Sequence, residues 1–184
     1  MTQHHGIKPH RSTRLRRGMM INKEDLPKLA RQTIEEHVLH DRMLEVSEGI
    51  SPELKERAGV FVSIKKNSDL RGCIGTIKPT QDNVVQEVKN NAISAAARDP
   101  RFPAIQADEL DNLTISVDII GKQEKVEGLE ELDPERYGVI IKSGRRTGLL
   151  LPKLEGINTP EEQVEIARRK AGLPRDSQFD LYRF

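Results

Sequence analysis

The sequence predicts an α+β fold, in which helices pack on a mixed or antiparallel sheet. Apolar residues recur at helical spacing in three segments, residues 26–38, 84–96 and 164–171. Apolar and polar residues instead alternate in two segments, 60–64 and 113–119, as they do in half-buried strands. Polar turns indicate two hairpins. One joins residues 60–64 to 70–76, and the other joins residues 137–141 to 149–152. The 184 residues fit one domain with room for a smaller lobe.

The first predicted helix is amphipathic and ends near His40. Its apolar face consists of Leu26, Leu29, Ala30, Ile34 and Val38. Asn22 or Asp25 can cap its start, and Pro27 falls in the first turn, where the missing N–H costs little. His37 and His40 lie on one face at i and i+3. Because two ligands without a third usually belong to a solvated face, no metal site is predicted.

A hairpin follows, with residues 66–69 as its turn. Side chains on the returning strand alternate between its faces: Arg71, Cys73 and Gly75 share one, and Gly72, Ile74 and Thr76 share the other. A buried, unpaired arginine is too costly to persist, so a buried Arg71 needs an acidic partner. Asp99 and Asp118 are the candidates.

The second predicted helix starts after Pro79 with Thr80 as its cap. It ends near Asp99, because the residue before Pro100 is pushed out of helical geometry. Its inner stripe is mostly small and suits a helix that lies close on a sheet: Val84, Val88, Ala92, Ala95 and Ala96. The proline-bracketed corner that follows, residues 101–103, is predicted to be architectural.

The strand at residues 113–119 has the clearest alternation and is predicted to be central. The later hairpin turns around residues 143–148, which contain two arginines and two glycines besides Ser143 and Thr147. Arg145 and Arg146 either bind a phosphate or carboxylate there or belong to a solvated turn. Both interpretations remain open from the sequence.

The last predicted helix has a well-defined start and end. Thr159 is its cap, Pro160 takes the first position, and Glu162 completes a capping box. The helix stops at Gly172, which suits a left-handed terminus. The tail, residues 179–184, is predicted to pack as an edge strand or a clasp.

Charge and composition narrow the classes of function. The formal net charge is +1, but residues 1–20 contain no acid and five cations, Lys8, Arg11, Arg14, Arg16 and Arg17. These residues are predicted to form a basic arm, and the remaining chain, being slightly acidic, is not expected to bind nucleic acid by itself. A lone cysteine excludes an internal disulfide framework, and no apolar run approaches the roughly 18–20 residues that span a bilayer. A cytoplasmic protein is therefore expected.

The most unusual chemistry lies in residues 70–76. Cys73, the only cysteine, stands between Gly72 and Gly75 and beside Arg71. A thiol, a guanidinium and unhindered backbone N–H groups favour an anion site or a nucleophile. The alternative is that the segment serves folding: its glycines let a helix press on the hairpin, and Cys73 is a small buried hydrophobe.

Several motifs, in order, resemble the AMMECR domain family over residues 22–184. They are Leu70–Thr76, Asn91–Ala96, Asp99–Pro103, Tyr137-Gly138, Gly148–Pro152 and Lys170–Pro174. The resemblance implies a two-lobed α+β fold with a larger mixed lobe and a smaller one, in a soluble intracellular protein without a known cofactor. It also implies partners, because relatives occur beside or fused to a Memo-type protein and a radical S-adenosylmethionine protein. The organisation expected is a basic arm at 1–20 and one family domain of two closely packed lobes at 21–184.

The function predicted is that of an accessory protein in a modification pathway, which binds a partner or a small anionic ligand. The pocket is expected around Arg71, Gly72 and Cys73. The full set of predicted binding residues is Arg71, Gly72, Gly75, Asn91, Asp99, Arg101, Arg145 and Arg146. Two alternatives are an enzyme that uses Cys73 as its nucleophile, and a nucleic-acid-binding protein that uses the arm at residues 1–20.

Overall fold

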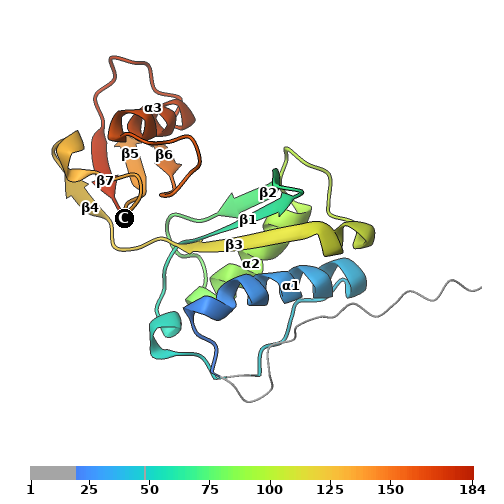
Figure 1. The fold of residues 1–184 in the computed structure, drawn as a ribbon. Coiled ribbons are helices and arrows are strands. Elements are labelled where there is room, and N and C mark those ends of the chain that lie inside the picture. Colours follow the sequence, from blue (N-terminus) through green and yellow to red (C-terminus); the bar gives the residue numbers. More distant parts are fainter. Residues whose placement is uncertain (1–19, 48) are drawn as a thin grey trace, which may run out of the picture. The chain divides into compact units, whose positions relative to one another are not determined.

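The computed structural model describes residues 20–47 and 49–184, which divide into two compact units (Figure 1). Unit 1 ends at Ile119, and unit 2 comprises Ile120–Phe184. Each unit contains an antiparallel sheet with helical cover, so the predicted α+β class is confirmed. The predicted basic arm lies outside the described residues, apart from Met20. That the two lobes pack closely stays a prediction.

Unit 1 is a three-stranded antiparallel sheet with two helices. Its strands are β1 (Val60–Lys66), β2 (Asp69–Gly75) and β3 (Leu113–Ile119), and its helices are α1 (Leu26–His40) and α2 (Val84–Ala97). The strand order is β2-β1-β3 (Figure 1). The prediction that residues 113–119 form the central strand is wrong, because β1 occupies the centre. Alternation reveals that one face of a strand is buried, but it says nothing about how many neighbours the strand has.

The two faces of this sheet differ sharply. Val60, Val62 and Ile64 point into the core, where they are fully buried among the apolar residues of α1 and α2. Phe61 and Ser63 point the other way and are only half-buried. Both helices of unit 1 lie on the first face, so the second face has no helix over it within the described part of unit 1 (Figure 1).

The hairpin between β1 and β2 contains a two-residue turn and a bulge. Asn67 and Ser68 both have positive φ, 51° and 72°, as the central residues of a type I′ turn do. The register then shifts from Lys65↔Leu70 to Ile64↔Gly72. Arg71 is left without a partner on β1, and such a bulge can aim a side chain away from the regular alternation.

The start of α2 differs from the prediction. Asn83, not Thr80, is the cap, and its side chain accepts a hydrogen bond from the backbone N–H of Gln86. Thr80 instead donates from its N–H and its hydroxyl to the fully buried Glu87, at 2.8 and 2.9 Å. Burial alone would raise the pKa of Glu87, but hydrogen bonds from Thr76, Gln81 and Thr80 outweigh it and lower the pKa. Glu87 thus ties the loop after β2 to α2.

Unit 2 is a four-stranded antiparallel sheet with one helix. Its strands are β4 (Glu124–Val126), β5 (Val139–Ser143), β6 (Arg146–Leu150) and β7 (Asp180–Arg183), in the order β4-β7-β5-β6. Because β7 pairs with both β4 and β5, the prediction that the tail forms an edge strand is wrong. The charged segment that begins at Glu124 supplies one edge strand, β4, and β6 forms the other edge.

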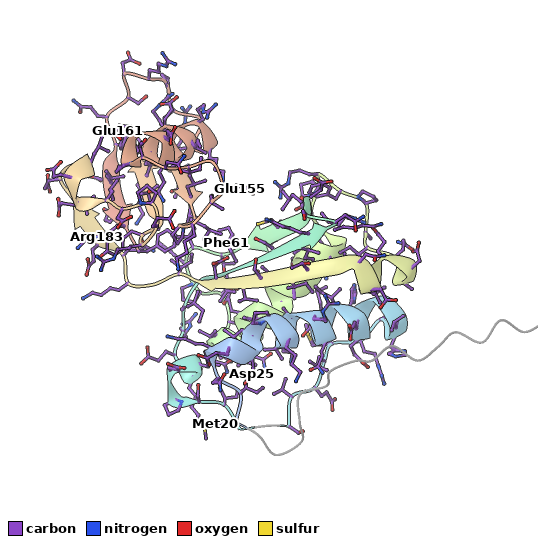
Figure 2. All side chains as sticks on the ribbon, viewed as in Figure 1. Met20, Asp25, Phe61, Glu155, Glu161 and Arg183 are labelled. Carbon is purple, nitrogen blue, oxygen red and sulfur yellow. The ribbon has the colours of Figure 1, made fainter. Side chains whose placement is uncertain are left out.

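Helix α3 (Pro160–Lys170) covers this sheet and confirms the predicted ends. The Thr159 and Glu162 capping box is present, and Gly172 has a φ of +66°. Acidic residues such as Glu161 lie in its first turn and basic ones in its last, which suits the helix dipole (Figure 2). Residues 20–47 and 49–184 also contain four short 3₁₀ helices: η1 (Lys23–Asp25), η2 (Pro52–Lys55), η3 (Ala107–Asn112) and η4 (Leu129–Glu131). Of the helices described, none is both long and apolar enough to cross a membrane.

Candidate functional site

Cys73 lies on the helix-free face of unit 1. It stands opposite Ser63 in the β1–β2 register, and its Sγ is 3.3 Å from the Ser63 Oγ. The neighbouring pair on the same face is Phe61 and Gly75, where the aromatic ring covers the glycine so closely that a Cβ would lie 2.3 Å from it. Cys73 is half-buried, so its thiol is neither a core group nor a fully solvated one.

Asp99 and Arg101 hold the backbone of Cys73 at the outer edge of β2. The N–H of Cys73 donates to the Asp99 carboxylate at 2.9 Å, and its carbonyl accepts from the Arg101 Nη2 at 3.1 Å. Because β2 is an edge strand, these groups would otherwise need water or another chain. Asp99 and Arg101 therefore take the place of a neighbouring strand at Cys73.

The same two side chains form a tight ion pair. Nε and Nη2 of Arg101 donate to the two Asp99 oxygens at 3.0 and 2.8 Å, and the Arg101 N–H adds a bond at 3.1 Å. The hydrogen bond from Arg101 holds the pKa of Asp99 well below its usual range, even though burial opposes the shift. Asp99 is therefore a permanent anion that fixes the guanidinium in place.

Hydrogen bonds fix one side of the Arg101 guanidinium, and the other side is exposed. Its side chain is 54% exposed, against 2% for that of Asp99. A guanidinium has five N–H donors. Three of them serve Asp99 and Cys73, and the two on Nη1 meet no acceptor among the described residues. Hydrogen bonding to Asp99 raises the pKa of Arg101, although burial opposes the shift. A fixed cation thus lies beside the thiol.

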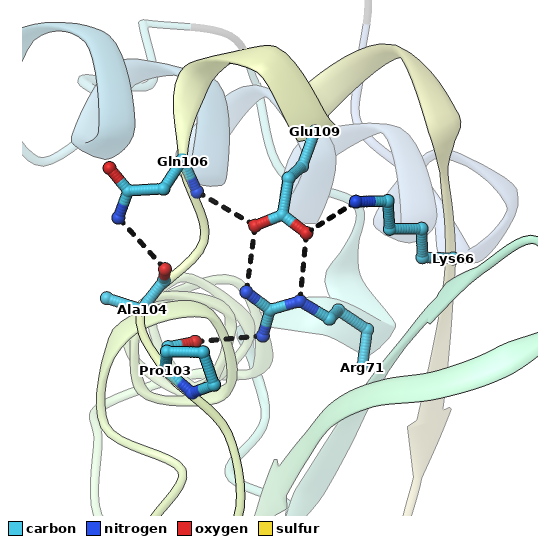
Figure 3. A network of polar contacts seen from close by, with 6 residues as sticks. All are labelled: Lys66, Arg71, Pro103, Ala104, Gln106 and Glu109. Atoms are coloured by element: carbon cyan, nitrogen blue, oxygen red, sulfur yellow. Dashed lines mark hydrogen bonds and ion pairs between the residues drawn. The ribbon is translucent and has the colours of Figure 1, made fainter.

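Arg71 has different hydrogen-bond partners from Arg101. Its guanidinium donates to both Glu109 oxygens, at 2.8 and 3.0 Å, and to the Pro103 carbonyl at 2.8 Å (Figure 3). Lys66 donates to the same carboxylate at 2.9 Å, and the Arg71 side chain is only 13% exposed. Neither predicted acid, Asp99 or Asp118, is its partner. The bulge directs Arg71 toward Glu109, so Arg71 belongs to a structural network with Lys66, Pro103 and Glu109.

Glu109 is the important residue that sequence reasoning missed. It lies on η3, where it also accepts the backbone N–H of Gln106 at 3.1 Å as part of a capping box. Hydrogen bonds from Arg71 lower its pKa to about 2, against the opposing effect of burial. The Gln106 and Glu109 spacing was a visible helix-start signal. Nothing local linked it to an arginine so distant in sequence.

The remaining predicted binding residues fall into two groups. Asn91 and Gly72 serve packing: the amide of Asn91 donates to the Val60 carbonyl at 2.9 Å, and a Cβ on Gly72 would lie 2.2 Å from the Ala95 carbonyl oxygen. Arg145 and Arg146 belong to unit 2, whereas Cys73 belongs to unit 1. As binding residues, all of them stay predictions.

Within residues 20–47 and 49–184, no set of three histidine, cysteine, aspartate or glutamate residues is placed to hold an ion. His37 faces Asp41, with 3.6 Å between Nδ1 and the carboxylate. That contact falls within one helical turn and involves a single, largely exposed carboxylate.

Comparison with known proteins gives a consistent family assignment. The family model described as AMMECR1 matches residues 27–184. A protein from Thermotoga maritima is 47% identical, over 90% of this chain and 97% of its own length. A protein from Clostridium acetobutylicum is 44% identical over 88% of this chain, but the match spans only 35% of that longer protein. The crystal structure of an uncharacterized protein from Pyrococcus horikoshii is similar with a TM-score of 0.79 and 34% identity, over 88% of this chain and 87% of that one.

Proposed function

The chain belongs to the AMMECR1 family, and from that premise we propose that it is an accessory protein that binds a small anionic ligand at Arg101, beside Cys73. The family model and the similar proteins assign no reaction, so the proposal depends on the site itself. The observation that carries it is the half-satisfied guanidinium of Arg101, which is held by Asp99 and turned outward at Nη1.

A carboxylate or phosphate suits this arrangement. Nη1 offers two N–H groups in a fixed plane, and oxyanions accept paired hydrogen bonds from such a fork. Because Asp99 already immobilises the side chain, a ligand would pay little of the rotamer entropy that a free arginine loses on binding. Cys73 and Ser63 offer a thiol and a hydroxyl on the adjoining face as further weak polar contacts.

Binding is favoured over nucleophilic catalysis by what surrounds the thiol. The hydrogen-bonding neighbour of Sγ is the Ser63 hydroxyl, which is not a base at neutral pH. A catalytic thiol needs a base or another group that stabilises the thiolate. The charge of Arg101 favours a thiolate, but Arg101 cannot act as the base that takes up the thiol proton.

The accessory role rests on a second observation. The match to the Clostridium acetobutylicum protein covers about a third of that chain, so the domain occurs there with further sequence. A domain that occurs within a longer protein is consistent with a role beside another protein or domain. Memo-type and radical S-adenosylmethionine proteins, which the motif resemblance implies as partners, are therefore the first to test for association.

Isothermal titration with inorganic phosphate and with small dicarboxylates is expected to detect binding that depends on Arg101. Arg101→Gln should weaken it at least tenfold, about 1.4 kcal/mol, because the paired hydrogen bonds are lost. Arg98→Gln removes a charge from an exposed arginine nearby and should leave the affinity unchanged. Equal affinities of the Arg101 variant and the wild type, or no binding to the wild type, would contradict the proposal.

Alkylation of Cys73 distinguishes the binding site from a catalytic thiol. Because Cys73 is the only cysteine, mass spectrometry after iodoacetamide treatment reports on this site alone. We expect reaction at neutral pH to be no faster than for a free thiol in an unfolded peptide, because Sγ is half-buried against Ser63. An acceleration of about tenfold or more would instead favour the nucleophile.

The nucleic-acid alternative depends on the arm at residues 1–20, which lies outside the described residues except for Met20. It stays a prediction, and a salt-dependent RNA or DNA affinity that disappears when the arm is deleted would support it.

A further inference from the structure

We propose that the outer edge of β6, in unit 2, binds an acidic segment of a partner protein in extended conformation. This site belongs to unit 2, whereas the Arg101 site belongs to unit 1, and it does not depend on the function proposed there. Two observations combine here: an edge strand with outward backbone groups, and a concentration of cations along that edge.

The backbone observation comes from the hairpin register. The strand order places β6 at the edge, and a two-residue turn, Gly144 and Arg145, joins it to β5. Ser143 and Arg146 flank that turn and form its hydrogen-bonded pair, so the backbone groups of Thr147 and Leu149 point outward. The contact from the Lys170 amine to the Leu149 carbonyl, at 3.3 Å, agrees with this assignment.

The charge observation comes from the hairpin tip and the end of α3. Arg146 donates to the carbonyl of Gly172 at 2.9 Å, which brings the tip and the helix terminus together. Five exposed cations belong to these two segments: Arg145, Arg146, Arg169, Lys170 and Arg175. The acids near them are Glu165, which pairs with Arg168 and Arg169, and Asp176. The other acidic residues of unit 2 lie in β4 and β7, between β4 and β5, in the loop after β6 (Glu155) and in the first turn of α3.

An acidic strand matches both features. Its backbone would pair with the N–H and carbonyl of Thr147, an exposed residue of the edge, as in other cases of strand addition. Its carboxylates would accept hydrogen bonds from the cations beside the edge, Arg145, Arg146 and Lys170. A nucleic acid offers the charge without the peptide ladder, so a peptide is the occupant that uses both.

Fluorescence anisotropy with the full chain and a labelled peptide of alternating glutamate and valine tests the proposal. The acidic peptide should bind more weakly as salt is raised, and the matching lysine–valine peptide should bind at least tenfold more weakly than the acidic one. Lys170→Gln should reduce the affinity severalfold, whereas Lys122→Gln, at another exposed lysine of unit 2, should not.

Thr147→Pro tests the backbone half of the idea. The N–H of Thr147 points away from β5, so proline removes a donor to the added strand without removing a bond of the hairpin. We expect binding to be lost while the fluorescence of Tyr137 and Tyr182, both in unit 2, stays unchanged. If the acidic and basic peptides bind equally or not at all, or the Thr147 variant binds like the wild type, the cations serve only to protect the edge from aggregation and the proposal is overturned.

Discussion

Replacing Gly72 with alanine is expected to destabilise unit 1 by about 3 kcal/mol or more. The new Cβ would lie 2.2 Å from the carbonyl oxygen of Ala95 and 3.2 Å from its carbon. Both are backbone atoms of α2, so no side-chain rotation relieves the overlap. The helix would have to move off the sheet and open the core around Ile64, whose side chain lies 3.7 Å from the same point.

Hydrogen exchange of the backbone amides of β1 and β2, as a function of denaturant, measures this loss within unit 1. Tyrosine fluorescence serves as the internal control, because both tyrosines lie in unit 2 and should report unchanged stability. Gly49→Ala is the matched substitution, since nothing lies within 4 Å of its added Cβ. If the two variants differ by less than about 0.5 kcal/mol, α2 does not press on β2 as the structure describes.

Replacing Glu109 with glutamine is expected to cost about 3 kcal/mol, because it leaves the nearly buried guanidinium of Arg71 without a countercharge. Lys66 loses the same partner. Asp108→Asn alters an exposed acid on the same 3₁₀ helix and should change stability by less than about 0.5 kcal/mol. Hydrogen exchange in unit 1 again provides the measurement, and equal losses in the two variants would show that the network adds nothing.

The pH dependence of stability gives an independent test of Glu109. Its pKa falls from 4.5 to about 2 in the folded chain, so folding favours the ionised form. The stabilisation is therefore complete above about pH 4.5 and is lost as the pH falls toward about 2, by about 3 kcal/mol in total. The stability difference between the wild type and Glu109→Gln should shrink over this window. A difference that stays constant from neutral pH to about pH 2 would contradict the assignment.

Much of the fold follows from local sequence patterns. The helices were predictable because caps such as Thr159 and stops such as Gly172 act within one turn of the chain. The hairpins were predictable because Asn67 and Gly144 permit the positive φ that two-residue turns require. Strand order was not predictable, since which strand becomes central depends on how the chain returns to the sheet.

The candidate site was likewise predictable only in part. Sequence alone determined that residues 70–76, with their single thiol and two glycines, were an unusual strand, and that Arg101 lay in a proline-bracketed corner just after Asp99. Only the tertiary structure decided which arginine is available: a bulge aims Arg71 at Glu109, while Asp99 holds Arg101 outward beside Cys73. The physical reason is that ion pairs form between residues far apart in the chain, whose proximity depends on packing, whereas turns and caps are settled by their immediate neighbours.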